Sequence, residues 1–435
     1  MFVRRYTIVL LLIVLFATLH LPTNRSKILN EQESSNCSQL CPYVMSLSHD
    51  YLHFDSHHLT RHYPDFVCQL NFRNMADWVY GWPYGSHERI ETTRNGKHIA
   101  PCLPDGSIIY VSIWAIGTFF TDVYPHLFHR FVLITGEGDS SSPILDYLER
   151  ADSKIIHWFG QNGAIASSTS KKFTHIPIGI KFINEKSLKN DLLFCSIGLQ
   201  CYEMAEAMKT IYKEQSNYTL PQLYGDIDEP IKYIQPMDMT HRILFNKDNM
   251  LRKNLLLINY LSKNDETGLR RRIWKDLCIH RKKNQSFIMC LSKTSGVNPS
   301  NLIDVYRRNR EHSFWLSPRG NGLDCHRTWE ALYLDMIPIV WNSSLNVLYE
   351  NLPVVVIHDY KEITEEFLNE KLKKISTTKF YLMKQTYRME KLRNAYWRRL
   401  ILSKSRHSIK EINKRTNVCW RVANSTKSSV FPWQK

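Results

Sequence analysis

The chain has 435 residues, of which 43% are hydrophobic and 23% charged, so it is long enough for two or three ordinary domains with a sizeable core. No long stretch has the low-hydrophobicity composition of disorder, which excludes a mainly disordered protein. The formal net charge of +16 indicates anionic ligands such as nucleotide diphosphates, acidic sugars or a membrane surface. The basic residues are dispersed, without zinc-finger spacing or an arginine-rich tail, so nucleic acid is not an expected partner.

The first residues predict insertion into a membrane. Arg4 and Arg5 precede an apolar run from about Tyr6 to Leu21, which is shorter than the roughly 20 residues that span an average bilayer. An uncleaved signal anchor and a cleaved signal peptide are both open interpretations. No A-x-A cleavage site follows the run, which favours the anchor. The positive-inside rule then places the two arginines in the cytosol and the rest of the chain in the lumen.

Sequons and cysteines fit a lumenal address. Glycosylation acceptors occur at Asn24, Asn36, Asn217, Asn284, Asn342 and Asn424. The ten cysteines are an even number, which permits disulfides in an oxidising compartment. Spacing makes Cys195 with Cys201 and Cys278 with Cys290 the plausible local pairs. No C-x-x-C pair is present, so no structural metal is expected.

Composition divides the chain into five segments. Residues 1–21 are expected to be a short cytoplasmic tail and the anchor, and the polar residues 22–50 a lumenal stem. We expect a first globular domain at 51–245, a second at 246–402, and a tail at 403–435 that packs back or extends.

The first globular block alternates strand-like and helix-like patterns. A β-rich run begins at Ser107, and a clear strand at Phe131–Thr135 ends in Gly136, Glu137, Gly138 and Asp139. A helix-like stretch from about Pro143 leads to a strand in residues 154–162, and residues 175–180 form a short buried strand or turn. Such alternation predicts a parallel α/β sheet.

The pattern restarts after residue 240. Residues 254–277 combine an apolar strand, a polar loop and a helix, and residues 353–363 form a strand that ends in a turn. Further apolar runs predict strands at 287–291, 313–317 and 337–341. Helical patterns lie between them and again from about Thr364 to Leu402. Two consecutive blocks predict two Rossmann-like domains facing a cleft, with ligands beyond the carboxyl ends of the strands.

One stretch of the second block, "FWLSPRGNGLDCHRTWEALYLDMIPIVW" (Phe314–Trp341), combines a strand, a glycine loop, a helix and a strand. Gly320 and Gly322 let the backbone approach a ligand closely, and Asp324 is a candidate N-cap for the helix. A helix N-terminus beside Arg319 and Arg327 is a natural anion site.

Glu330 follows His326 by four residues, so both are expected on one face of this helix. A carboxylate there can accept both hydroxyls of a ribose, which makes the stretch a candidate cradle for a sugar nucleotide. The alternative is a tight turn with Glu330 paired to a surface arginine. The P-loop pattern G-x-x-x-x-G-K-[ST] is absent, which argues against an ATPase.

The same stretch resembles the C-terminal signature of exostosin-family glycosyltransferases, in which an R-G-x-G loop precedes R-x-x-E-A-L and a short I-P-I/V strand. The matching residues are Arg319, Gly320, Gly322, Arg327, Glu330, Ala331, Leu332, Ile337, Pro338 and Ile339. The resemblance implies a two-domain glycosyltransferase B-type fold and a type II membrane protein of the Golgi or endoplasmic reticulum. It also implies a nucleotide-sugar donor, expected to be a UDP-sugar, in the C-terminal domain. The expected donor-binding residues are Arg319, Gly320, Asn321, Gly322, His326, Arg327 and Glu330.

Transfer to a glycan or glycoprotein acceptor needs a base for the attacking hydroxyl. The candidates in the first domain are Asp122, Glu137, Asp139 and His157, of which at most one is the base. Each has a structural alternative as a helix cap, a turn former or a core histidine.

The reaction is expected to be inverting and to need no cofactor beyond the donor. The "DID" at Asp226–Asp228 imitates a metal motif, but no strand pattern leads into it and Pro230 follows, so we interpret it as a loop. Fixed cations can stabilise the diphosphate without a metal, and the cluster Arg270–Arg272 is expected either to aim one arginine at the cleft or to form a solvated helix face.

Two rival functions stay open at this point. One is a non-catalytic lumenal protein that binds carbohydrate or nucleotide-sugar on the same scaffold. The other is a sulfotransferase, but "FVLITGEGDSSSP" lacks the basic residue of a phosphosulfate-binding loop.

Overall fold

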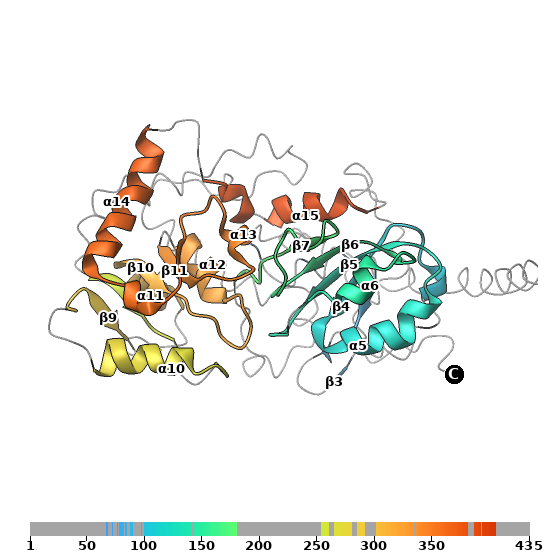
Figure 1. Ribbon diagram of the computed structural model, residues 1–435, viewed down its shortest axis with the longest axis horizontal. Coiled ribbons are helices and arrows are strands. Elements are labelled where there is room, and N and C mark those ends of the chain that lie inside the picture. Colours follow the sequence, from blue (N-terminus) through green and yellow to red (C-terminus); the bar gives the residue numbers. More distant parts are fainter. Residues whose placement is uncertain are drawn as a thin grey trace, which may run out of the picture.

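The computed structural model describes a little over half of the chain, and nearly all of this is two α/β halves (Figure 1). The described residues are 100–180 except 141, 254–260, 265–280, 285–291, 302–405 except 335, 382–386 and 393, and single residues and short segments between 67 and 97. The predicted anchor and stem lie outside them, as do Asp226–Asp228 and the pair Cys195 with Cys201. None of the described helices is long and apolar enough to cross a membrane.

The first sheet has five parallel strands in the order β1-β4-β5-β6-β7. They are β1 (Trp78–Tyr80), β4 (Ser107–Ser112), β5 (Phe131–Gly136), β6 (Ile155–Gly160) and β7 (Phe173–His175). A separate hairpin joins β2 (Pro83–Tyr84) to β3 (Glu88–Arg89). Every residue of β4 and β5 is buried, since side chains alternate between two covered faces. This burial explains why the sequence shows continuous apolar runs here.

Short helical turns cover one face of this sheet. They are η1 (Ala100–Cys102), η2 (Ile113–Ala115), α5 (Ile116–Thr118), the π-helical turn η3 (Phe119–Val123), η4 (Tyr124–His126) and α6 (Leu145–Glu149). Their aromatic side chains pack with Trp78, Leu133 and Trp158 of the strands. The β-rich run from Ser107 therefore ends at Ser112, and Asp122 lies in a helical turn rather than after a strand.

The second sheet also has five parallel strands, but its order is β12-β11-β10-β8-β9. The strands are β8 (Asn254–Ile258), β9 (Ile288–Cys290), β10 (His312–Leu316), β11 (Ile337–Trp341) and β12 (Val355–Ile357). The chain adds β9 on one side of β8 and then crosses to build β10, β11 and β12 on the other. The order therefore reverses between β8 and β10, as in doubly wound sheets. The predicted strand 337–341 is confirmed with the same bounds.

Helices surround the second sheet. They are α10 (Leu269–Trp274), its π-helical extension η9 (Lys275–Ile279), α11 (Leu302–Asn309), α12 (His326–Tyr333), α13 (Asn346–Tyr349), η10 (Tyr360–Glu362) and α14 (Glu365–Tyr381). The predicted disulfide between Cys278 and Cys290 is confirmed, with a Cα–Cα distance of 5.8 Å, and it links η9 to β9.

One hydrophobic core joins the two halves. It contains Ile108 and Val132 from the first sheet, Leu257 and Trp315 from the second, and the buried side of α12. Tyr333 of α12 accepts a hydrogen bond from the Val67 backbone N–H at 2.8 Å. The halves therefore share a buried interior as well as facing each other.

The C-terminal helices return to the first sheet. After η11 (Met389–Leu392), α15 (Asn394–Leu402) lies beside β6 and β7 in Figure 1, and its Trp397 and Ile401 belong to the shared core. α15 belongs to the predicted segment 246–402, and it packs against the core that both halves share.

His157 lies under this C-terminal segment. Its side chain is only 6% exposed, and its Nε2 is 2.8 Å from Thr174 Oγ1. Burial, and secondly the charge of Lys404, lower the pKa of His157 from 6.5 to about 4. The neutral imidazole is therefore the form that the folded protein prefers.

This depressed pKa predicts acid sensitivity. Between pH 6.5 and pH 4, His157 is protonated in the unfolded chain but stays neutral in the folded chain. The free energy of unfolding should therefore fall by up to roughly 3 kcal/mol over this window. His157→Gln should flatten the pH dependence of Tm relative to wild type. The exposed His358 is the control, since His358→Gln should leave the slope unchanged; equal slopes for all three proteins would contradict the assignment.

Candidate functional site

The candidate site lies where the strand order of the second sheet reverses. The carboxyl ends of β8 and β10 diverge there, because the connections that follow them leave in opposite directions. Asn259 and Tyr260 follow β8, and Ser317, Pro318 and Arg319 follow β10. The loop that the sequence singled out thus begins at the position where doubly wound sheets bind ligands.

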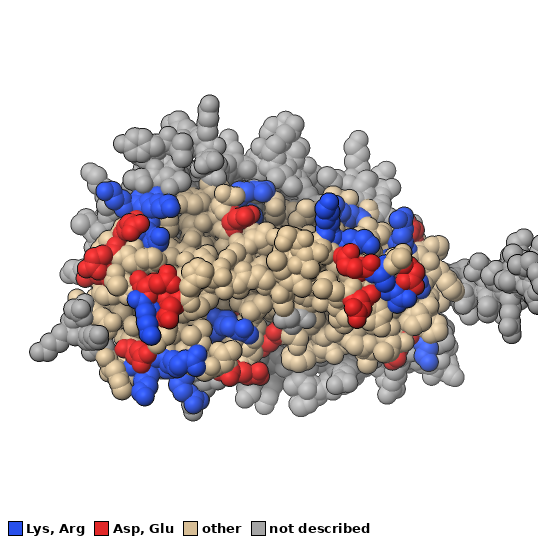
Figure 2. Space-filling model, viewed as in Figure 1, with Lys and Arg blue, Asp and Glu red and all other residues tan. Residues whose placement is uncertain are grey.

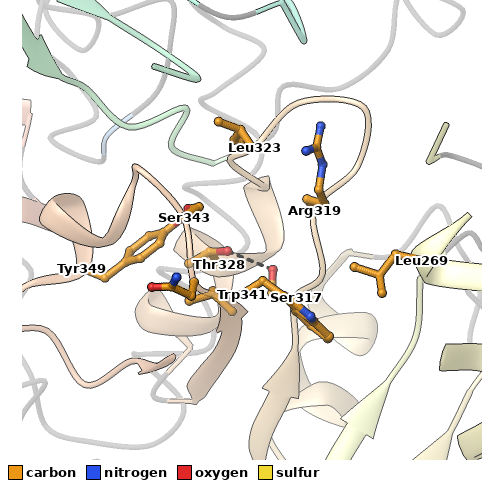
Figure 3. Close-up of a pocket in the computed structure, with 10 residues that line it drawn as sticks. Leu269, Ser317, Arg319, Leu323, Thr328, Trp341, Ser343 and Tyr349 are labelled. Carbon is orange, nitrogen blue, oxygen red and sulfur yellow. Dashed lines mark hydrogen bonds between the residues drawn. The ribbon is translucent and has the colours of Figure 1, made fainter. Parts of the chain in front are cut away.

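A cavity of about 160 Å³ opens beside this loop. Figure 3 shows Arg319 on the loop, Leu269 of α10 on one side and Tyr349 on the other, with Ser317 hydrogen-bonded to Thr328 at 2.9 Å. The remaining lining residues are Leu323, Val340, Trp341, Asn342 and Ser343. Ligand pockets usually measure roughly 300–1,000 Å³, so this recess can hold a phosphate or a sugar ring but not a whole nucleotide-sugar.

Arg319 folds over its own loop. Its Nη2 donates to the Asn321 carbonyl at 2.8 Å and its Nε to the Gly320 carbonyl at 3.4 Å. The loop therefore holds the guanidinium at the cavity with its other N–H groups available to an anion.

Arg270 supports the loop from below. It is only 6% exposed, and it donates to the carbonyls of Pro318 and Arg319 at 3.0 and 2.9 Å. Asp265 fixes the start of α10 by accepting from the backbone N–H groups of Thr267 and Arg270 at 2.9 and 2.8 Å. One arginine of the basic cluster thus turns inward, while its neighbour Arg271 is exposed.

A second cation lies over aromatic rings at the switch point. The guanidinium of Arg327 is 5.5 Å from the Tyr260 ring and 5.9 Å from the Trp315 ring, and Arg270 is 5.7 Å from the Tyr260 ring. Burial raises the pKa of the Tyr260 hydroxyl and lowers the pKa of Arg270. Two guanidiniums therefore share an apolar setting in which their attraction for an anion is screened little.

Asp324 has a different role from the one that the sequence suggested. The residue at the N-cap of α12 is Cys325, without a side-chain cap. The buried Asp324 carboxylate accepts from the backbone N–H groups of Ile178 and Cys325 and from Trp329 Nε1 and Tyr349 OH, at 2.8–3.1 Å. Burial raises the pKa of Asp324, and the donors oppose this rise. Asp324 is thus an internal connector, because Ile178 belongs to the other half.

The later part of the loop also contacts the other half. Asn162 accepts from the Asp324 backbone N–H at 2.7 Å, and a Cβ on Gly322 would lie 2.9–3.1 Å from the Asn162 side chain. His326 Nδ1 is 2.8 Å from the Gly179 carbonyl. Gly322 is therefore required by close packing against Asn162, and His326 is committed to the junction between the halves.

Glu330 lies on another flank of α12 from the cavity. Successive helical residues turn by about 100°, so Glu330 is roughly opposite Thr328, which lines the cavity. The half-buried Glu330 shares its side of the helix with His326 and Arg327. The structure thus places Arg319 at the cavity and Arg327 and Glu330 on the flank that faces the switch point.

The four candidate bases lie at three different places in the first half. Glu137 and Asp139 lie in the turn after β5, which Asn162 holds by donating to the Gly138 carbonyl at 2.8 Å. His157 is buried, and the exposed Asp122 accepts from Thr121 Oγ1 at 2.8 Å. Of the candidate bases, only those in the turn with Glu137 and Asp139 are connected to the Arg319 loop through Asn162.

The backbone of that turn is unusual. Glu137 has φ of 62° and Asn162, at the end of the neighbouring strand, has φ of 53°. Non-glycine residues seldom adopt this left-handed region, and strained residues cluster at functional sites. The Glu137 backbone N–H donates to Gln161 Oε1 at 3.1 Å, which helps to hold the turn.

Sequence reasoning did not identify Tyr260, Asn162 or Gln161. Tyr260 directly follows a predicted strand, so its position at a strand end was the available signal. Asn162 and Gln161 act through contacts with distant residues, and no local pattern marks them.

Neither a scan against models of known protein families nor a search among curated proteins finds a significant match to this chain. Among the described residues, no group of three or more His, Cys, Asp or Glu side chains is arranged to hold a metal ion. The resemblance to exostosin-family enzymes therefore rests on the quoted residues alone.

The Asp324 network predicts a large effect of a small substitution. Asp324→Asn should lower the free energy of unfolding by about 1.5–3 kcal/mol, because an amide NH₂ must face groups that are themselves donors. Chemical denaturation measures the change. The exposed Asp139 is the matched control, since Asp139→Asn should have little effect; similar stability of the two variants would contradict the connector role.

Proposed function

We propose that the protein is a membrane-anchored, lumenal glycosyltransferase of the secretory pathway with a two-domain, glycosyltransferase B-type fold. It transfers a sugar from a nucleotide-diphosphate donor, expected to be a UDP-sugar, to a glycan or glycoprotein acceptor, with inversion. The observation that carries the proposal is the Arg319 loop at the switch point, with two further guanidiniums behind it. The motif resemblance and the apolar N-terminal segment supply the reaction class and the compartment.

In this proposal the donor lies along the loop and the partly exposed flank of α12. Arg319 binds the diphosphate, Arg327 adds charge from the aromatic cluster, and Glu330 accepts the ribose hydroxyls. In this placement the nucleotide does not enter the recess lined by Ser317 and Thr328. Arg319 and Glu330 would then contact the same nucleotide from different sides of the loop.

The chemistry needs two kinds of group. The acceptor oxygen attacks the anomeric carbon and loses its proton to a base, and the bond between that carbon and the diphosphate oxygen breaks. Glu137 or Asp139 is the base that the geometry favours, because their turn is tied through Asn162 to the donor loop. The guanidinium of Arg319 stabilises the charge that develops on the leaving diphosphate.

The surface is consistent with small anionic ligands. Figure 2 shows basic and acidic side chains next to one another toward the ends of this face, with a largely uncharged middle. The described part of this face therefore carries no continuous basic stripe of the kind that binds nucleic acid.

Arg319→Ala tests the donor loop. The substitution should weaken binding of uridine diphosphate by about tenfold or more, because a charge-assisted bond contributes roughly 1.5–3 kcal/mol. Thermal-shift titration of the full chain gives the affinity. Arg271→Ala is the matched control, since Arg271 is an exposed arginine of α10 and should have no effect. Equal affinity of all three proteins would remove Arg319 from the site.

A pair of substitutions on α12 decides where the ribose lies. Glu330→Gln should lower the affinity for uridine diphosphate several-fold without changing Tm, whereas Thr328→Val should leave the affinity unchanged. The opposite pattern would place the nucleotide in the recess and give Glu330 a structural role.

Product analysis separates the transferase from a binding protein. A panel of nucleotide-sugars should show release of diphosphate with one donor. Tight binding without hydrolysis or transfer of any donor would instead support the non-catalytic alternative.

A further inference from the structure

The most exposed large apolar side chain among the described residues is Trp114, at 69%. It belongs to η2, which begins immediately after the carboxyl end of β4. A tryptophan exposed to this extent loses most of the free energy that its burial would provide. Its position at the ligand-binding edge of a parallel sheet gives this exposure a functional explanation.

The indole lies against the turn that holds the favoured bases. A Cβ on Gly138 would be 2.3 Å from Ile113 Cγ2, 3.0 Å from Trp114 Nε1 and 3.1 Å from Trp114 Cε2, so the absence of a side chain at residue 138 leaves room for both side chains of η2. Glu137 and Asp139 flank this glycine, and Asp139 is exposed. The open aromatic ring therefore lies beside a turn that carries two carboxylate residues, the half-buried Glu137 and the exposed Asp139.

The same surface is fixed relative to the proposed donor site. The Gly138 carbonyl accepts from Asn162, and Asn162 in turn accepts from the Asp324 backbone N–H. Two hydrogen bonds thus connect the turn beneath Trp114 to the loop that begins at Arg319.

We propose that Trp114 is the stacking platform for a sugar ring of the acceptor. One face of a pyranose presents C–H groups that pack on an indole, while its hydroxyls donate to carboxylates at the edge. Trp114 supplies the first contact, and Glu137 and Asp139 supply the second. This inference rests on the proposed function, and it assigns the acceptor to the first half.

Phe128 provides a matched control. It is also an exposed aromatic residue, at 53%, but it lies in the segment that precedes β5, at the amino edge of the same sheet. A general effect of removing exposed aromatic surface would appear in both variants, whereas an acceptor site would be lost only with Trp114.

The experiment uses the purified full chain and its Trp114→Ala, Trp114→Phe and Phe128→Ala variants. A glycan array in the presence of uridine diphosphate first identifies a bound glycan, which then serves as acceptor with the active UDP-sugar. We expect Trp114→Ala to raise the acceptor KM by about tenfold, Trp114→Phe to raise it less, and Phe128→Ala to leave it unchanged. The affinity for uridine diphosphate should be the same in all four proteins.

An unchanged acceptor KM in Trp114→Ala, with intact nucleotide binding, would overturn the inference and leave the proposed function standing. Loss of binding to phosphatidylcholine vesicles in Trp114→Ala, without loss of glycan binding, would also overturn it in favour of a membrane contact. Glycan binding that depends on Trp114 in a chain that never binds a nucleotide would retain the sugar site and refute the transferase.

Discussion

The structure depends on a buried carboxylate between its halves. Asp324 receives hydrogen bonds from one backbone N–H of the first half and from three groups of the second. A buried carboxylate without partners would be very costly, whereas one with several donors is tolerated and demands a fixed geometry. The loop from Arg319 to Cys325 can therefore hold its shape only while the halves are docked. The proposed donor site and the contact between the halves thus depend on the same loop.

Gly322 of the loop and Gly138 of the turn show what a glycine in a sequence does and does not reveal. A glycine marks a place where something approaches the backbone closely, but the sequence does not say what approaches. At Gly322 it is the side chain of Asn162, and at Gly138 it is the side chain of Ile113, followed by the indole of Trp114. The expectation that the backbone is closely approached at Gly322 thus has a partner within the protein, and ligand approach there stays a prediction. His326, also expected at the donor, has its ring nitrogen against a carbonyl of the other half.

The strands were predictable because both faces of each sheet are covered, which produces continuous apolar runs of strand length. The predicted strand 337–341 matches β11 residue for residue, and the apolar start of the segment 254–277 forms β8. Contacts over long sequence separations left no local signal. Asp324 accepts a hydrogen bond from Ile178, which is 146 positions away in the sequence. Besides burial, the charge of Lys404, near the C-terminal end of the described chain, lowers the pKa of His157. The candidate bases could therefore be proposed from sequence, but only the fold could separate the buried His157 from the turn at Glu137.

The carboxyl edges of the two sheets differ in strand order and in the charged groups that they carry. The second sheet reverses its order at β8, and cations gather at that reversal, where a diphosphate can be neutralised. The first sheet adds its described strands in chain order, and its carboxyl edge carries carboxylates and an exposed indole, which suit hydroxyl groups and sugar rings. A diphosphate would be repelled by the first edge, and an uncharged glycan gains little from guanidiniums at the second. The hydrogen bonds of Asn162 and Asp324 connect these two chemically different edges, which is the arrangement that the proposed transfer from an anionic donor to a neutral acceptor requires.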